Sequence, residues 1–283
     1  MKTIQLNNKV EMPLLGFGVF QITDEKECED SVLTALKAGY RLIDTAACYG
    51  NERAVGNAIK KSGIPREEIF ISSKVWIQDA GYEKTKESFR KTLENLQTDY
   101  LDLYLIHMPY GDYYGSWRAM EELYEEGKIK AIGVCNFEID RLVDLILNNK
   151  IVPAVNQMET HPFCQQKALR EVMKKYDIAL MAWAPFAEGQ NSIFTDKTLQ
   201  AIGDKYGKTP AQIVLQWLSQ EKIIAIPKSV HSDRIQQNFA VHDFELTQED
   251  LTQIHQMDTE NSLILEITSL AEVYRLYEIR FEQ

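Results

Sequence analysis

The sequence predicts an α/β protein, a (β/α)8 barrel of the TIM type with a β-hairpin before it and a helical tail after it. Between residues 14 and 239, eight short apolar stretches alternate with segments of helical periodicity, and no linker or low-complexity stretch divides the 283 residues. Strands that alternate with helices pair in parallel through right-handed crossovers. Eight such units in a chain of this length favour a closed barrel, and we expect one domain over residues 1–283. No GxGxxG motif follows the first strand, which argues against a Rossmann domain.

The first element is expected to be a hairpin within residues 1–13 that closes the bottom of the barrel. Residues 4–6 and 10–12 each alternate apolar and polar side chains, and the turn-forming pair Asn7 and Asn8 lies between them. This pattern is typical of two antiparallel strands joined by a tight turn.

The barrel units follow in order. The first strand is predicted at 14–18, and its helix begins at the cap Asp24 and ends at Gly39. Further strands are expected at 41–45, 69–74, 101–107, 129–134, 154–157, 178–183 and 223–226. Further helices are expected at 52–61, 83–96, 116–125, 139–147, 165–175, 196–206, 211–219 and 232–239. In the tail, residues 258–283, the apolar residues have the spacing of an amphipathic helix that packs on the barrel, caps a pocket or joins a dimer.

The composition excludes several classes of function. The net charge of −11 gives a surface that repels nucleic acid and anionic lipid, so an anionic cofactor needs a local basic pocket. The four cysteines are scattered without metal-ligand spacing, which indicates neither a disulfide framework nor a metal site and fits a reducing cytoplasm. No apolar run has the length of a signal peptide or a membrane span, so we expect a cytoplasmic protein without a membrane partner.

Polar residues stand at the ends of several predicted strands. They are Asp44, Lys74, His107, Asn136 and Gln157. Each alone reads as a capped strand end, but in a barrel the C-terminal ends of all strands meet at one mouth, where active sites lie. A carboxylate at the end of a buried strand is costly unless it is paired, and Lys74 is the candidate partner of Asp44.

Three sequence motifs carry a resemblance to a known family. The segment GYRLIDTA at 39–46, followed by Tyr49, Glu52 and Gly56, closely resembles a signature of the aldo-keto reductase family. IPKS at 226–229, followed by Arg234 and Asn238, resembles the cofactor signature of that family. LIHMPYGD at 105–112 and WAPFAEG at 183–189 are similar to the bacterial members related to diketogluconate reductases. The resemblance extends from about residue 10 to residue 257.

The resemblance implies a catalytic tetrad of Asp44, Tyr49, Lys74 and His107. A hydride that arrives at a carbonyl carbon leaves negative charge on the oxygen, which must receive a proton. Tyr49 is the implied donor, and because its ordinary pKa is about 10, the Lys74 ammonium is expected to lower that pKa. His107 would hydrogen-bond the carbonyl oxygen, and Asp44 would orient Lys74.

The implied cofactor is NADPH. Trp183 is expected to stack on the nicotinamide, Asn136 and Gln157 to bind its carboxamide, and Gly18, with Val19 and Phe20, to cover the pyrophosphate. Cys135 stands where the family usually has serine, and as a weak donor it would form a poorer contact there or serve as a small buried residue. Lys228 and Arg234 provide cations that favour a 2′-phosphate. The remaining candidates for cofactor binding are Asp44, Pro185, Phe186, Ser229, Val230, Gln237 and Asn238.

The expected substrate is a small aldehyde, dicarbonyl or keto-sugar, and no nucleic acid is expected as a partner. Candidate pocket residues are Phe20, Tyr49, Trp76, His107 and Met108. Two other functions are compatible with the motifs: a non-catalytic NADPH-binding protein on the same fold, and an aldolase that forms a Schiff base on Lys74. We expect a monomer or a weak homodimer.

Overall fold

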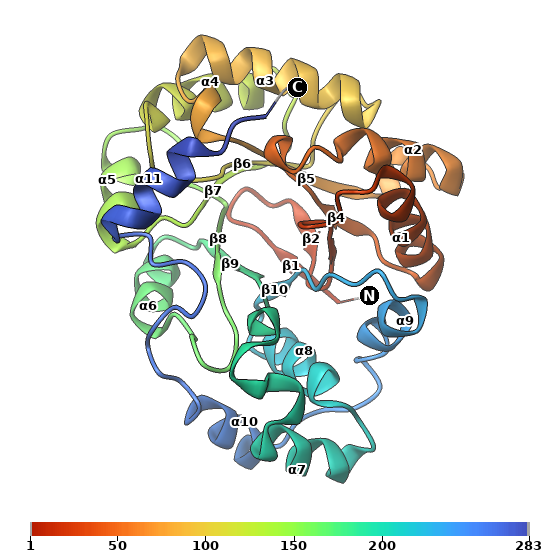
Figure 1. Ribbon diagram of the computed structural model, residues 1–283. Coiled ribbons are helices and arrows are strands. Elements are labelled where there is room, and N and C mark those ends of the chain that lie inside the picture. Colours follow the sequence, from red (N-terminus) through yellow and green to blue (C-terminus); the bar gives the residue numbers. More distant parts are fainter. Residues whose placement is uncertain (1, 282–283) are drawn as a thin grey trace.

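The computed structural model describes residues 2–281 and shows a closed parallel barrel (Figure 1). Its strands follow one another in sequence order around the sheet: β3 (Phe17–Gly18), β4 (Leu42–Asp44), β5 (Phe70–Val75), β6 (Leu103–Ile106), β7 (Ile132–Cys135), β8 (Val155–Glu159), β9 (Ala179–Trp183) and β10 (Ile224–Ala225). A parallel bridge between Leu15 and Ala225 joins the first and last strands, and the amide of Gly16 donates to the carbonyl of Ala225 at 2.8 Å. The predicted barrel is therefore confirmed.

Nine helices within residues 2–281 follow the barrel strands and surround the sheet (Figure 1): α1 (Glu25–Ala38), α2 (Glu52–Ser62), α3 (Tyr82–Leu96), α4 (Tyr113–Glu125), α5 (Ile139–Leu147), α6 (Lys167–Lys175), α7 (Lys197–Tyr206), α8 (Pro210–Gln220) and α9 (Ser232–Phe239). The first begins where the side chain of Asp24 accepts from the amide of Glu27 and ends at Gly39, whose φ of 112° places it in the left-handed region. The sequence analysis did not predict α10 (Gln248–His255), which Thr247 and Asp250 begin with a capping box.

The hairpin lies where it was expected. Strands β1 (Thr3–Gln5) and β2 (Glu11–Pro13) pair antiparallel with Ile4 opposite Met12. Met12 is fully buried against the residues that begin the barrel strands, including Leu42 and Phe70. The hairpin thus closes the N-terminal end of the barrel and leaves the opposite end for a site.

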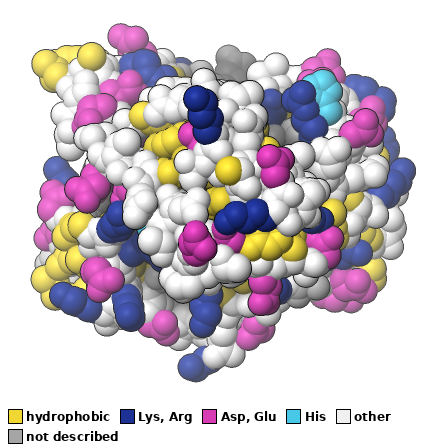
Figure 2. Space-filling model, turned by 90° about the horizontal axis from the view of Figure 1, so that it is seen from below, with side chains coloured by type: hydrophobic (Ala, Val, Ile, Leu, Met, Phe, Trp, Pro, Cys, Tyr) yellow, Lys and Arg dark blue, Asp and Glu magenta, His cyan; other side chains and the backbone are white. Residues whose placement is uncertain are grey.

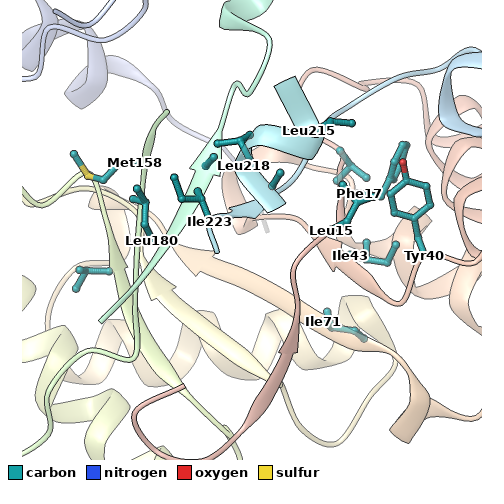
Figure 3. Packing of buried hydrophobic residues seen from close by; sticks show 14 of the residues in the cluster. Leu15, Phe17, Tyr40, Ile43, Ile71, Met158, Leu180, Leu215, Leu218 and Ile223 are labelled. Atoms are coloured by element: carbon teal, nitrogen blue, oxygen red, sulfur yellow. The ribbon is translucent and has the colours of Figure 1, made fainter. Parts of the chain in front are cut away.

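Side chains alternate between the inside of the barrel and the layer under the helices, as the period of a strand requires. In β4, Leu42 packs inside while Ile43 packs in the outer layer. Figure 3 shows part of that outer layer, where Phe17, Ile43 and Tyr40 lie close together; the rings of Phe17 and Tyr40 meet edge to face at 5.8 Å between centroids. The same alternation turns the next residue of β4, Asp44, back toward the inside.

The tail crosses the mouth of the barrel and carries α11 (Leu270–Glu278), an amphipathic helix (Figure 1). Glu159, at the end of β8, accepts from the hydroxyl of Ser262 at 2.5 Å and from the amide of Leu263 at 2.8 Å. Farther along, the indole of Trp76 donates to the carbonyl of Ile279 at 3.2 Å. Leu276 is buried beside Trp76, so the tail is a fixed part of the mouth.

Figure 2 shows acidic and basic side chains interspersed over one face of the molecule. No helix among residues 2–281 combines the length and the apolar composition needed to span a membrane.

Candidate active site

A cavity of about 510 Å³ opens at the C-terminal ends of the strands, opposite the hairpin. Part of its polar lining comes from four strands and the segments just after them: Asp44, Tyr49, His107, Cys135, Asn136 and Gln157. The structure therefore brings the predicted strand-end residues together, and the reason is the strand period. Asp44, Cys135 and Gln157 occupy inward-facing positions at the upper ends of their strands, above the apolar layer that the hairpin covers.

Lys74 lies beneath this cavity and is fully buried. Its ammonium is 2.7 Å from Oδ2 of Asp44 and 2.8 Å from the carbonyl oxygen of Thr45, and it donates to the hydroxyl of Tyr49 at 3.3 Å. In the sheet, Asp44 pairs with Ser72, so Lys74, two residues farther along β5, faces the same side. The predicted ion pair is present and has a direct contact with the phenol.

Asp44 has a second partner across the barrel. Its Oδ1 accepts from the side-chain amide of Gln157 at 3.0 Å. A buried charge is tolerated only when it is paired and hydrogen-bonded. Lys74 and Gln157 together offset the cost of burying the Asp44 carboxylate and hold it in one position.

Tyr49 ends a short 3-10 turn, Ala47–Tyr49, and Gly50 follows in the left-handed region with φ 69°. Its pKa differs from the sequence expectation. Burial raises the pKa of the Tyr49 phenol well above its ordinary value, and the charge of Asp44 adds to this. The net direction is opposite to the one expected from Lys74, because burial is the largest influence on this phenol. The phenol is therefore protonated at neutral pH.

His107 is also buried, and its imidazole lies between two aromatic rings. The centroid of the Trp76 ring is 4.9 Å away and that of the Tyr49 ring 5.6 Å away, both edge to face. Burial, together with the positive charge of Lys74, lowers the pKa of His107 well below its ordinary value. The imidazole is therefore neutral near pH 7, and it carries one N–H group.

The residues expected to hold a nicotinamide are linked to each other. The indole of Trp183 donates to Oδ1 of Asn136 at 2.9 Å, and Asn136 donates to the backbone oxygen of His107 at 3.1 Å. Cys135 donates to Oε1 of Gln157 at 3.5 Å. The side-chain amides of Asn136 and Gln157 thus have partners within the protein, in addition to the carboxamide contact that the sequence analysis expected of them. Trp183, Pro185 and Phe186 line the cavity, so its wall here is largely aromatic and apolar.

The last residue of β3 and the two residues that follow it have different environments. Gly18 lines the cavity, and a Cβ there would lie 2.9 Å from the carbonyl oxygen of Ile226, so glycine is also needed to close the barrel. Val19 is fully buried in the outer core, away from the cavity lining. Phe20 is 50% exposed, and its ring contacts that of Tyr49 at 4.9 Å between centroids.

The predicted basic pocket lies between β10 and α9. Lys228 lines the cavity and is exposed, and Arg234 is exposed in the first turn of α9. Neither forms an ion pair with an acidic residue among residues 2–281. Two unpaired cations in a chain of net charge −11 fit an anionic ligand such as a nucleotide phosphate.

The other residues predicted around that pocket surround the same turn. Ser229 is buried and accepts from the amide of His231 at 3.1 Å, and Asn238 is buried on α9. Val230 is partly buried against the core, and Gln237 is exposed on α9. The polar side chains and the N-terminal end of α9 therefore lie beside the two cations, as a dinucleotide site requires.

The predicted substrate residues form an apolar wall. Trp76 and Met108 are buried and line the cavity beside His107. Sequence reasoning gave capping a pocket as one of three alternatives for the tail but named no tail residue in the pocket, and it did not name Cys48. Residues of the tail line the cavity, namely Ile264, Leu265, Arg275, Leu276 and Ile279. Cys48 also lines it. The apolar spacing of the tail predicted a buried face but could not show what that face covers.

With this geometry in place, comparison with known proteins decides the family. The model of the aldo/keto reductase family matches residues 14–259. The chain belongs to the aldo/keto reductase family. As a member, it is an NADP-dependent oxidoreductase that reduces aldehydes and ketones to alcohols, which confirms the sequence prediction.

Three proteins show how close this aldo/keto reductase is to its relatives. Glyoxal reductase of Bacillus subtilis (strain 168) is 50% identical over 253 residues, 89% of this chain and 91% of that protein. Methylglyoxal reductase DkgA of Escherichia coli (strain K12) is 43% identical over 258 residues, 90% of this chain and 93% of that protein. The crystal structure of an aldo-keto reductase of Bombyx mori in complex with NADP is 32% identical, has a TM-score of 0.89 and matches over 96% of each chain. These matches confirm the family and the barrel.

Proposed function

We propose that this reductase acts through Tyr49, which donates the proton to the carbonyl oxygen, with Lys74, Asp44 and His107 in supporting roles. The observation that carries the proposal is the contact of 3.3 Å between the Lys74 ammonium and the Tyr49 hydroxyl at the floor of the cavity. Lys74 stabilises the phenolate that remains after proton transfer, and Asp44 holds Lys74 in place. His107 donates a hydrogen bond that orients the carbonyl oxygen.

The cofactor is held by the groups on the other side of the same cavity. Lys228 and Arg234 would hold the 2′-phosphate, with Ser229 and Asn238 beside them, and the Trp183 ring, which lines the cavity, would offer a stacking surface for the nicotinamide. When bound, NADPH supplies the hydride to the carbonyl carbon. Asn136 and Gln157 hold this wall rigid through their hydrogen bonds to Trp183 and Asp44.

The substrates are small α-oxoaldehydes such as glyoxal and methylglyoxal. Two relatives that match about nine-tenths of the chain are a glyoxal reductase and a methylglyoxal reductase, and the apolar wall of Trp76 and Met108 leaves a compact space beside His107. An aldolase mechanism on Lys74 is disfavoured, because its side chain is fully buried and committed to Asp44. The chain acts as a single barrel domain, a monomer or weak homodimer in the cytoplasm, where its four cysteines remain thiols.

The experiment that tests this function is an assay of the purified chain with glyoxal and methylglyoxal. We expect consumption of NADPH with formation of the corresponding alcohol, and slower turnover with NADH. Cofactor binding without turnover across a panel of aldehydes would instead indicate a non-catalytic NADPH-binding protein.

Replacing either Lys228 or Arg234 by Met is expected to raise the KM for NADPH about 10- to 100-fold and to change the KM for NADH little. Each cation forms a charge-assisted hydrogen bond to a group that only NADPH carries, worth roughly 1.5–3 kcal/mol. Steady-state kinetics with both cofactors measure the effect, and Lys174→Met, on the exposed face of α6, is the charge-matched control. Equal changes for the two cofactors would contradict the assigned phosphate site.

The pH profile of reduction is expected to be flat from roughly pH 6.5 to pH 10. The raised pKa of Tyr49 keeps the donor protonated through the alkaline side of this range, and the lowered pKa of His107 keeps the imidazole neutral through the acidic side. Oxidation of the alcohol needs the phenolate, so its rate should rise about tenfold per pH unit over the same range. Initial rates of kcat/KM in both directions test this, and a fall in reduction above about pH 8 would show that Lys74 lowers the pKa of the phenol after all.

A further inference from the structure

Cys48, which lines the same cavity, contacts the imidazole of His107. It lies in the 3-10 turn immediately before Tyr49, and its Sγ is 3.5 Å from Nδ1 of His107, within hydrogen-bonding distance for sulfur. The ring itself lines the cavity and is buried. Among residues 2–281, Cys48 is the side chain that forms a hydrogen bond with a ring nitrogen of His107; Asn136 bonds to its backbone oxygen instead.

This contact matters because a neutral imidazole has one N–H group and two possible positions for it. If Nδ1 carries the proton, Nε2 has only a lone pair and cannot donate to a carbonyl oxygen. If Nδ1 accepts a hydrogen bond, the proton stays on Nε2, and His107 can donate into the cavity. The role proposed for His107 in carbonyl reduction requires the second form.

We propose that the Cys48 thiol donates to Nδ1 of His107 and thereby fixes the imidazole in the form that carries its proton on Nε2. Cys48 is a positioning residue, since it acts on the substrate only through His107, and the inference rests on the function proposed above. A donor is needed at this place, and the thiol qualifies because burial raises its pKa to about 12, so it keeps its hydrogen. The 3-10 turn that carries Tyr49 also carries Cys48. One short segment therefore positions the proton donor and determines the tautomer of His107.

The position of the proton can be measured directly, without relying on catalysis. Long-range ¹H–¹⁵N spectra of the full chain distinguish the two tautomers of each of the five histidines, and His107→Asn assigns the signal of interest. We expect the Nε2–H form in the wild type and in Cys48→Ser, whose hydroxyl is a stronger donor. In Cys48→Ala we expect a mixture of the two forms. Cys28→Ala, a buried cysteine on α1, is the matched control and should leave the spectrum of His107 unchanged.

Kinetics give a second readout. In Cys48→Ala, kcat for aldehyde reduction should fall about tenfold, the effect of losing one weak hydrogen bond, while the Kd of NADPH stays within about twofold. Cys48→Ser should recover most of the loss. The inference is overturned if Cys48→Ala keeps the pure Nε2–H form, or if the wild type shows the proton on Nδ1. If the spectra behave as expected and no variant reduces any aldehyde, the function proposed for the site fails while the role of Cys48 stands.

Discussion

Replacing Tyr49 by Phe is expected to lower kcat for aldehyde reduction by about 10²- to 10⁴-fold, the usual contribution of a positioned general acid. The change removes only the hydroxyl that lies 3.3 Å from the Lys74 ammonium. The ring contacts with Phe20 and His107 remain, so the wall of the cavity is preserved. The Kd of NADPH should therefore stay within about twofold.

The loss is measured from single-turnover rates, so that product release does not hide it, and fluorescence titration gives the Kd of NADPH. Tyr124→Phe, which removes a hydroxyl from a partly buried ring on α4, is the control and should retain the rate. A Tyr49→Phe enzyme with more than about a tenth of the wild-type rate would show that another group, or water, delivers the proton.

The second large effect is on stability as well as activity. Lys74→Met is expected to lower the free energy of unfolding by about 3–5 kcal/mol, because it leaves the buried Asp44 carboxylate without its counter-ion. It also removes the charge that stabilises the phenolate, so reduction should fall at least as far as in Tyr49→Phe. The side chain of Met has a similar length and fills the space, which limits the contribution of a cavity.

A double variant separates the two effects. Asp44→Asn combined with Lys74→Met removes both charges, so most of the lost stability should return while activity stays low. Urea unfolding measures the stability of each variant, and Lys86→Met provides the comparison. Lys86 pairs with Glu122 at the surface, where water screens the charges, so the loss of that pair should leave the urea midpoint nearly unchanged. If Lys74→Met alone is as stable as the wild type, the buried pair of Lys74 and Asp44 does not contribute to the free energy of unfolding as expected.

Much of the site could be predicted because its information is local. A carboxylate at the end of a strand, such as Asp44, needs a cation, and the alternation of each strand determines which residues face inward. Long motifs place Tyr49 and His107 in the same way. The predicted lowering of the pKa of Tyr49 was wrong, because its direction depends on burial and on the distance to the Asp44 charge, which are three-dimensional quantities.

Contacts between segments that lie far apart in the chain could not be predicted from the sequence either. The pairing of Gln157 with Asp44 joins opposite sides of the barrel, and that of Cys48 with His107 joins two loops. Helix α10 was missed although Thr247 and Asp250 form its capping box, a signal that was present in the sequence. The amphipathic pattern of the tail predicted α11, but only the folded chain shows that Leu276 packs beside Trp76.

Because of the position of the tail, the shape of the cavity entrance and the chemistry of the reaction depend on different parts of the chain. The family match ends at residue 259, whereas Leu276 and Ile279 belong to the segment beyond it and still line the cavity. Substitutions in this segment can therefore change the entrance of the cavity while the catalytic residues below it stay the same. Relatives that share the reaction are free to differ in which aldehydes they admit, and grafting this segment onto another member is a direct route to exchanging that preference.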